Sequence, residues 1–219
     1  VMVCNDPNRG KPVRALVHKT SRLYRKQSGL ELEDLRREEQ DADGAPTLLL
    51  ATGRGKVRAG IFSRNQLMTG GIESATALPM VRDARARGMR CIIPDPNARG
   101  ERYGMETFGR TISAIVDSED QAESSETQKQ RPQQQQDERE SSNTPLYVLA
   151  HSASGAQFVR HLREAANKHI LPRVRAVAFT DSTHNVQWAK KDAPELARML
   201  ESSRSLYVRS SDVRRDADA

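Results

Sequence analysis

The stretch LYVLAHSASGAQFVRHL, residues 146–162, constrains the fold of this chain more than any other part. Its first five residues form an apolar run that is too short for a helix, and its second half places apolar residues at helical spacing. Between them lies Ser152, with the small residues Ala150, Ser154 and Gly155 around it. A tight strand-to-helix turn needs small neighbours, because larger side chains would collide with the helix. The stretch therefore predicts a strand, a sharp turn that presents Ser152, and a helix.

Other short apolar runs also predict strands, and the first two of them predict buried ones. They are residues 47–51, the run MRCII that Pro94 and Pro96 end, and residues 174–179 and 205–209. Helical patterns lie between them, at 78–88 with Gly88 as the stop, at 154–169 with Phe158, Val159, Leu162 and Ala165 or Ala166 inward, and at 192–200 with Asp192 as the cap. Strands that alternate with helices indicate an α/β fold, a mostly parallel sheet with helices on both faces.

The remaining segments have less regular patterns. Apolar residues from Val13 to Gln27 fall on one helical face, which predicts an N-terminal helix followed by a charged loop up to residue 46. Residues 52–73 are rich in glycine and arginine and are expected to form a loop, and a helix is expected to begin near Glu106. Residues 117–144 contain no large apolar side chain, so they predict a disordered low-complexity insertion.

The charge of the chain bears on its partners. The formal net charge is +6, and the segment from Asp117 to Asn143 holds eight acidic and three basic residues, so the rest of the chain is strongly basic. A basic body favours nucleic acid or acidic partners. The basic residues are scattered, however, and only 4% of residues are aromatic, so an ordinary solvated surface is the alternative interpretation.

Several classes of protein are not indicated. No apolar run reaches the roughly 18 residues of a membrane span, and no secretory signal is recognised at the start. Cys4 and Cys91 do not make a disulfide framework. No cysteine and histidine spacing predicts a metal site, and no motif predicts a bound cofactor.

Polar residues follow three of the predicted strands. They are the loop around Gly53, the pair His151–Ser152, and the segment from Asp181 to His184. The carboxyl ends of parallel strands meet at one edge of a sheet, so these groups are expected to converge. The catalytic hypothesis assigns Ser152 as the nucleophile, His184 as the base and Asp181 as the supporting acid. In this hypothesis the backbone at Ala153 and Gly53 would hold the oxyanion.

Each assignment has a structural alternative. Ser152 could serve only as a small residue in the turn, Asp181 as a turn cap, and His184 as a hydrogen-bonding residue. His184 lies only three residues after Asp181, whereas hydrolases of this type place their histidine after a later strand. No histidine follows His184, and His151 directly precedes the serine and would point away from it.

Four segments in this order resemble the Arb-two domain family. They are VRAGIFSRNQLMTGGIESATALPMVRDARARG, IIPDPN, LYVLAHSASG and VRAVAFTDSTHNV. The resemblance runs from about Val13 to Arg209 and implies an α/β-hydrolase-like domain over residues 47–210, after an N-terminal part (1–46) and before a tail (211–219). The family serine corresponds to Ser152. Family members usually have glycine where Ser154 stands, and they continue into a further strand and a histidine that this sequence does not contain.

The resemblance implies a function as well as a fold. The family takes its name from an argonaute-binding subunit of a fungal small-RNA chaperone complex, and related domains occur in a cotranscriptional regulator and in histone deacetylases. The expected function is therefore a non-catalytic or vestigial hydrolase-like scaffold that acts in the nucleus or cytoplasm. Its expected partners are proteins of the argonaute, chromatin or RNA-processing type. The alternative is a serine esterase or acyl hydrolase with Ser152 as nucleophile.

Overall fold

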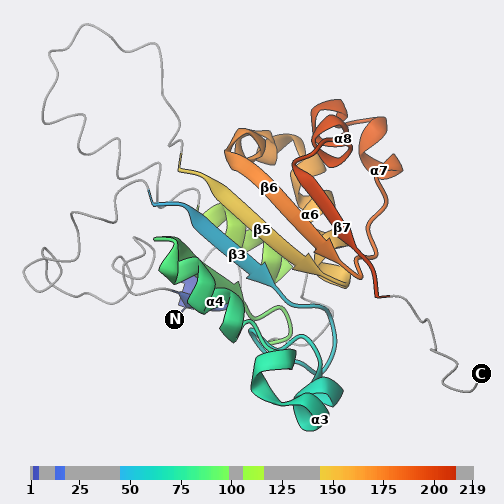
Figure 1. The fold of residues 1–219 in the computed structure, drawn as a ribbon. Coiled ribbons are helices and arrows are strands. Elements are labelled where there is room, and N and C mark those ends of the chain that lie inside the picture. Colours follow the sequence, from blue (N-terminus) through green and yellow to red (C-terminus); the bar gives the residue numbers. More distant parts are fainter. Residues whose placement is uncertain (1, 5–12, 18–44, 99–105, 116–143, 211–219) are drawn as a thin grey trace, which may run out of the picture.

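A seven-stranded sheet forms the centre of the molecule, with strand order β1-β2-β4-β3-β5-β6-β7 (Figure 1). The structure is a computed structural model that describes residues 2–4, 13–17, 45–98, 106–115 and 144–210. The strands β3 to β7 run parallel, while β2 is antiparallel to β4 and β1 is antiparallel to β2. Their bounds are β1 Met2–Cys4, β2 Val13–Val17, β3 Thr47–Ala51, β4 Arg90–Pro94, β5 Leu146–His151, β6 Val174–Thr180 and β7 Ser205–Val208. The predicted mostly parallel sheet is confirmed.

Helices cover both faces of this sheet (Figure 1). They are α3 Arg64–Ala75, α4 Leu78–Ala86, a helix over residues 106–115, α6 Ala153–Arg163, the 3-10 helix η3 Ala165–Arg173, α7 Gln187–Lys190 and α8 Pro194–Leu200. The parallel strands need such crossovers, because a two-residue turn cannot return the chain to a parallel neighbour. The predicted α/β fold class is thereby confirmed.

Alternate residues of each central strand enter two separate apolar clusters. Leu49 and Ala51 of β3 point to the larger cluster, which includes Phe108, Phe158 and Phe179 and lies against α6, α8 and the helix over residues 106–115. Leu50 points to the opposite face, where it packs in a smaller cluster with residues of α4. Burial on both faces explains why these strands are continuous apolar runs and not alternating ones. The sheet therefore holds its strand ends on a rigid base.

The predicted N-terminal helix is wrong where it can be compared with the structure. Residues Val13–Val17 form β2, which pairs with β4 through Leu16 opposite Ile93. Five residues are too few to separate a helical from a strand pattern, and pairing with β4 decides the outcome. The rest of the predicted helix and the charged loop up to residue 44 lie outside the described residues.

Three smaller expectations also need correction. The segment expected as a loop over residues 52–73 contains most of α3. Asp192 does not cap α8, since it forms an ion pair with Arg163. The helix expected over residues 154–169 ends at Arg163, because Glu164 adopts an extended conformation, and Ala165 and Ala166 are exposed. The predicted disordered insertion lies outside the described residues except for Thr144, and the tail from residue 211 lies outside them entirely.

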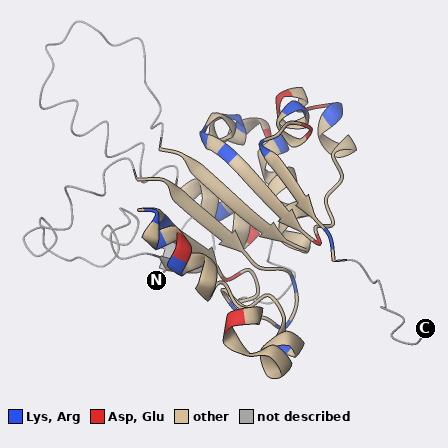
Figure 2. Ribbon diagram, in the orientation of Figure 1, with Lys and Arg blue, Asp and Glu red and all other residues tan. Residues whose placement is uncertain are grey.

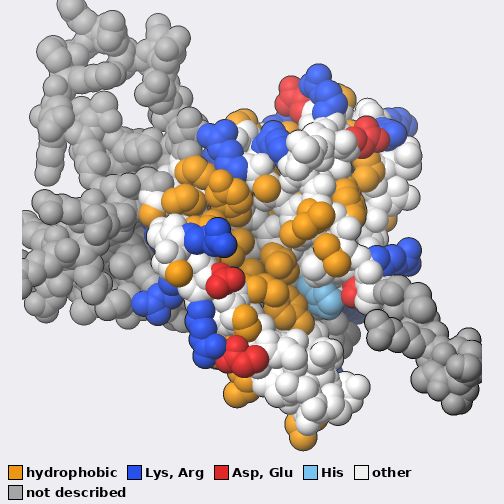
Figure 3. Space-filling model, in the orientation of Figure 1, with side chains coloured by type: hydrophobic (Ala, Val, Ile, Leu, Met, Phe, Trp, Pro, Cys, Tyr) orange, Lys and Arg blue, Asp and Glu red, His pale blue; other side chains and the backbone are white. Residues whose placement is uncertain are grey.

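The strand β7 lies at one end of the sheet and has β6 as its only neighbour among the described residues. Its residues Leu206, Tyr207 and Val208 are 60%, 48% and 49% exposed. Figure 3 shows hydrophobic side chains on the face of the sheet turned toward the viewer.

None of the helices in the described ranges is long and apolar enough to cross a bilayer.

Candidate active site

Ser152 lies at a sharp turn between β5 and α6, as the sequence predicts. Its backbone angles are φ 54° and ψ −123°, a conformation that residues other than glycine rarely adopt. Three backbone hydrogen bonds fix the turn. The Ser152 N–H donates to the carbonyl of Thr180 at 2.9 Å, and the Ser152 carbonyl accepts from the N–H groups of Gly155 at 3.2 Å and Thr183 at 3.3 Å. The strand, turn and helix are therefore built as in a nucleophile-presenting elbow.

Small residues are needed at two positions after Ser152, for a different physical reason at each. A Cβ atom on Gly155 would collide with the Oγ of Ser182 and lie 2.8 Å from its Cβ. The hydroxyl of Ser154 is fully buried and donates a hydrogen bond to the carbonyl of Thr52, at the end of β3. Gly155 therefore lets α6 approach the loop after β6, and Ser154 ties the elbow to the neighbouring strand.

The glycine-rich loop after β3 lies against the elbow. A Cβ atom on Gly53 would lie 3.0 Å from the Cβ and 3.4 Å from the Oγ of Ser152. Asn97, after β4, holds this loop in place: its Nδ2 donates to the carbonyls of Gly53 at 3.1 Å and Val57 at 3.0 Å, and its Oδ1 accepts from the N–H of Gly55 at 3.2 Å. Sequence reasoning missed Asn97, although its place just beyond a predicted strand end was a usable signal.

The two residues expected to hold an oxyanion both lie next to Ser152. Ala153 is the first residue of α6, so its N–H is among those without an intrahelical acceptor. The N-terminal end of a helix also favours negative charge. Gly53 contacts Ser152 from the other side, as described above. The backbone around Ser152 is thus compatible with binding a small anionic group.

His184 is close to the elbow but is bonded to another serine. Its Nδ1 lies 2.6 Å from the Oγ of Ser182, and its ring stacks on Phe179 with a centroid distance of 3.9 Å and lies near Tyr207 at 5.3 Å. Burial lowers the pKa of His184, which favours the neutral form of the ring. Within the described part of the chain, the Ser152 hydroxyl makes no hydrogen bond to this or any other histidine.

The carboxylate of Asp181 points to the segment that follows β7. Its Oδ1 accepts hydrogen bonds from the N–H and the hydroxyl of Ser210, both at 2.7 Å. These bonds are the main reason that the pKa of Asp181 is lowered, with smaller contributions from the charges of His151 and Arg209. The carboxylate is exposed and has a backbone φ of 47°. Asp181 therefore braces Ser210, and no hydrogen bond joins it to His184 in the described residues.

His151 is the other histidine at this edge of the sheet. A 3.0 Å hydrogen bond joins its Nδ1 to the Oγ1 of Thr180, and its ring forms a T-shaped contact with the ring of Phe62 at a centroid distance of 5.5 Å. Burial lowers the pKa of His151, and the nearby Asp181 charge partly offsets this shift. The structure thus brings all the predicted site residues to one edge of the sheet but does not align them as a hydrogen-bonded triad.

Comparison with known proteins gives the family. Residues 39–212, which are most of the chain, match the Arb2 domain. This chain belongs to the Arb2 domain family. The resemblance stated from the sequence is therefore confirmed.

A curated relative of this Arb2 domain is the cotranscriptional regulator ARB2A homolog of Gallus gallus. The two are 26% identical over 208 residues, an alignment that covers 75% of this chain and 48% of the relative. The chain therefore spans about half the length of the curated relative that it matches.

Two further properties of this Arb2 domain concern ligands. Among the described residues, no group of three or more His, Cys, Asp or Glu side chains is placed to hold a metal ion. Lys and Arg residues are spread over several helices and loops, and few of them lie in the strands of the sheet (Figure 2). The described surface thus carries positive charge without one broad basic face.

Proposed function

We propose that this Arb2 domain is a non-catalytic, hydrolase-like module that regulates RNA processing or silencing by binding other proteins. Its partners would be components of argonaute, chromatin or RNA-processing complexes, and its place of action would be the nucleus. The matching relative is named a cotranscriptional regulator, which supports a regulatory role for the domain. Because this chain spans about half of that relative, the partners belong to the proposal and not to the comparison.

The observation that carries the non-catalytic proposal is the set of partners taken by the three candidate catalytic side chains. His184 is bonded to Ser182, Asp181 is bonded to Ser210, and the hydroxyl of Ser152 has no hydrogen-bond partner in the described residues. A serine nucleophile needs a base within hydrogen-bond reach, and the base needs an orienting group. His184 and Asp181 instead support the local fold, and the Ser152 hydroxyl is left without a base.

The experiment is affinity purification from cells with quantitative mass spectrometry. Tagged wild-type protein and the variant Ser152→Ala are compared, because removal of one hydroxyl leaves the surface otherwise unchanged. We expect both proteins to enrich the same argonaute, chromatin or RNA-processing components. If the wild-type protein enriches none of these classes, the regulatory proposal is wrong. If partners are lost only in Ser152→Ala, partner binding depends on the serine hydroxyl and the non-catalytic proposal is wrong.

A serine esterase or acyl hydrolase is the second candidate. The observation that favours it is the strained backbone of Ser152, with Ala153 and Gly53 beside it, because such strain is concentrated at functional sites. In this alternative, substrate binding would have to turn His184 from Ser182 toward Ser152. Covalent capture of Ser152 by a fluorophosphonate probe separates the two candidates, since this reagent labels serines that are activated as nucleophiles.

Direct nucleic-acid contact has less support. The formal net charge of +6 favours it, but Lys and Arg are distributed over several helices and loops (Figure 2). Binding of an RNA oligonucleotide with a steep dependence on salt would support such a contact.

A further inference from the structure

The helix α3 is held away from the body of the domain and buries almost nothing. Ala75 is its only buried residue, whereas Met68 is 84% exposed and Ile72 is 58% exposed. Figure 1 shows α3 projecting beyond the carboxyl ends of the strands, and Figure 3 shows hydrophobic side chains at this tip of the molecule. A single exposed apolar residue is ordinary, but in α3 Leu67 is only half-buried and both Met68 and Ile72 face solvent, so this helix gains little stability from packing.

The base of this projection is nonetheless well fixed. The N–H of Phe62 donates to the carbonyl of Ala75 at 2.9 Å, and the N–H of Ala77 donates to the carbonyl of Gly60 at 2.8 Å. Ser63 caps the start of the helix by accepting from the N–H of Gln66 at 3.2 Å. The segments that enter and leave α3 are thus hydrogen-bonded to each other where they join the body of the domain.

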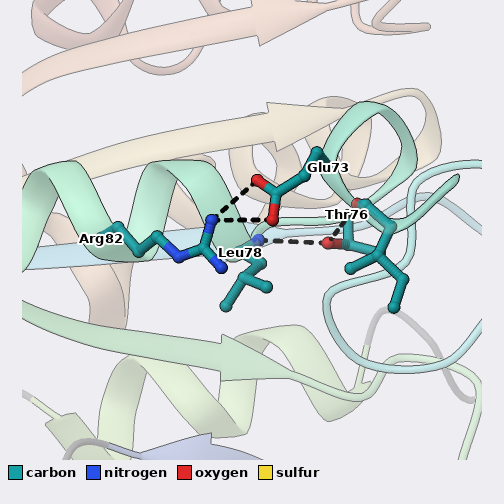
Figure 4. Close-up of polar contacts among 5 residues, drawn as sticks. Glu73, Thr76, Leu78 and Arg82 are labelled. Carbon is teal, nitrogen blue, oxygen red and sulfur yellow. Dashed lines mark hydrogen bonds and ion pairs between the residues drawn. The ribbon is translucent and has the colours of Figure 1, made fainter.

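The end of α3 is also tied to α4, as Figure 4 shows. The guanidinium of Arg82 donates to both carboxylate oxygens of Glu73, at 2.7 and 2.8 Å. The hydroxyl of Thr76 donates to the carbonyl of Ile72 at 2.8 Å and accepts from the N–H of Leu78 at 3.2 Å. These contacts use the polar groups of the corner and leave Met68 and Ile72 pointing to solvent, so the apolar side chains are presented on a fixed support.

The loop before α3 and the first nine residues of α3 carry basic side chains and no acidic ones. Residues 52–72 contain four basic residues and no acidic residue. The basic residues are Arg54, Lys56, Arg58 and Arg64, all exposed. The nearest acids are already in ion pairs, Asp95 with Arg58 at 2.8 Å and Glu73 with Arg82. A partner that covers this surface would therefore gain from carrying acidic groups.

We propose that α3 and the basic loop before it, residues 52–63, are a docking surface for an acidic segment of a partner protein. The segment would place large apolar side chains against Met68 and Ile72 and its carboxylates against Lys56 and Arg64. This inference rests on the proposed function, for which it names the surface and the chemistry of the partner. The exposed apolar side chains favour a protein over a nucleic acid, whose backbone would contact the cations and leave methionine and isoleucine uncovered.

The docking surface is also connected to the elbow. Phe62, at the base of α3, contacts His151, and Gly53, at the start of the basic loop, contacts Ser152. A partner bound at α3 would therefore lie next to the strand ends where Ser152 is presented.

The test uses fluorescence anisotropy with a panel of synthetic amphipathic peptides that carry leucine and phenylalanine on one face and glutamate on the other. We expect wild-type protein to bind members of the panel, and the double variant Met68→Ser with Ile72→Ser to lose about tenfold or more in affinity. Lys56→Glu with Arg64→Glu should weaken binding and remove its salt dependence. Leu206→Ser, which changes a residue that is 60% exposed on β7, is the matched control and should bind as wild type does. Circular dichroism checks that each variant is folded.

Several results would overturn the inference. They are failure of every acidic peptide to bind wild-type protein, equal binding by the Met68 and Ile72 double variant, and equal binding of peptides in which lysine replaces glutamate. Tighter binding of single-stranded oligouridine, unaffected by the loss of Met68 and Ile72, would assign the surface to nucleic acid. The proposed function is read separately: if the double variant still purifies the same regulatory partners from cells, the docking surface is wrong and the regulatory role stands.

Discussion

The hydroxyl of Ser182 lies 2.6 Å from Nδ1 of the His184 ring. His184 is the histidine that a catalytic mechanism would assign to Ser152, so this contact gives the base a different serine as its partner. Gly155 makes the arrangement possible, because it leaves room beside α6 for the side chain of Ser182, which lies in the loop after β6. The elbow and the histidine are thus held together by packing that does not use the Ser152 hydroxyl.

Gly155→Ala should destabilise the domain by about 1–3 kcal/mol, because the added methyl group meets Ser182 and lies 3.0 Å from the ring of Phe179. Urea denaturation measures the change. Gly70→Ala is the control, since its added methyl group meets mainly the exposed and rotatable hydroxyl of Ser74. Equal stability of Gly155→Ala and the wild type would show that α6 and the loop after β6 do not pack as described.

Ser154→Ala should lower the free energy of unfolding by about 1–3 kcal/mol, because it leaves the buried carbonyl of Thr52 without its hydrogen-bond donor. The same denaturation experiment measures it, with Ser74→Ala as the control for loss of an exposed hydroxyl. A loss no larger than that of Ser74→Ala would mean that the serine is only a small residue in the turn.

Acidification should destabilise the domain as the pH falls below about 6.5, the usual pKa of histidine. Burial lowers the pKa values of His151, His161 and His184 below the usual 6.5, so the unfolded chain takes up protons first as the pH falls. The contribution of these histidines is therefore complete above pH 6.5 and is lost below it. The lowered pKa of Asp181 acts at more acidic pH, below its usual 3.8.

Thermal unfolding at pH 7.5 and pH 5.5 measures this effect, and His184→Gln should reduce the difference between the two midpoints. A midpoint that rises on acidification, or a pH dependence unchanged in His184→Gln, would contradict the burial of this ring.

The ion pair between Glu73 and Arg82 should contribute little by itself, about 0.2–1 kcal/mol, because both side chains are 60% exposed. A double-mutant cycle with Glu73→Gln and Arg82→Gln measures the coupling, which should shrink at high salt. A coupling well above this range would mean that α3 is held by charge and not by the hydrogen bonds at its base.

Much of the sheet could be predicted from the sequence, because the central strands are apolar on both faces and stand out from their surroundings. The elbow could be predicted for the same reason, with small residues between a buried strand and an amphipathic helix. The segment Val13–Val17 could not, since pairing with β4 and not local periodicity makes it a strand. The helix α3 was hidden by Gly70 and Gly71, which favour a loop in isolation, and Gly71 does break the helical geometry with a φ of 80°.

The contacts within the site were beyond sequence reasoning. Asp181, Ser182 and His184 are so close in the chain that several hydrogen-bond patterns are possible, and small backbone differences select one of them. Positive φ at Asp181 turns its carboxylate to Ser210, and Ser182 then meets the histidine. The residue types at the strand ends were therefore predictable, whereas their pairing was not.

The most direct test of the account is labelling of the folded protein with a fluorophosphonate probe, followed by intact-mass and peptide mass spectrometry. Wild type and Ser152→Ala are compared at neutral pH, with a known serine hydrolase as a positive control for the reagent. If Ser152 is not activated, no adduct forms on it under conditions that label the control fully. A stoichiometric adduct on Ser152 that disappears in Ser152→Ala would contradict the account and would establish the serine as an activated nucleophile.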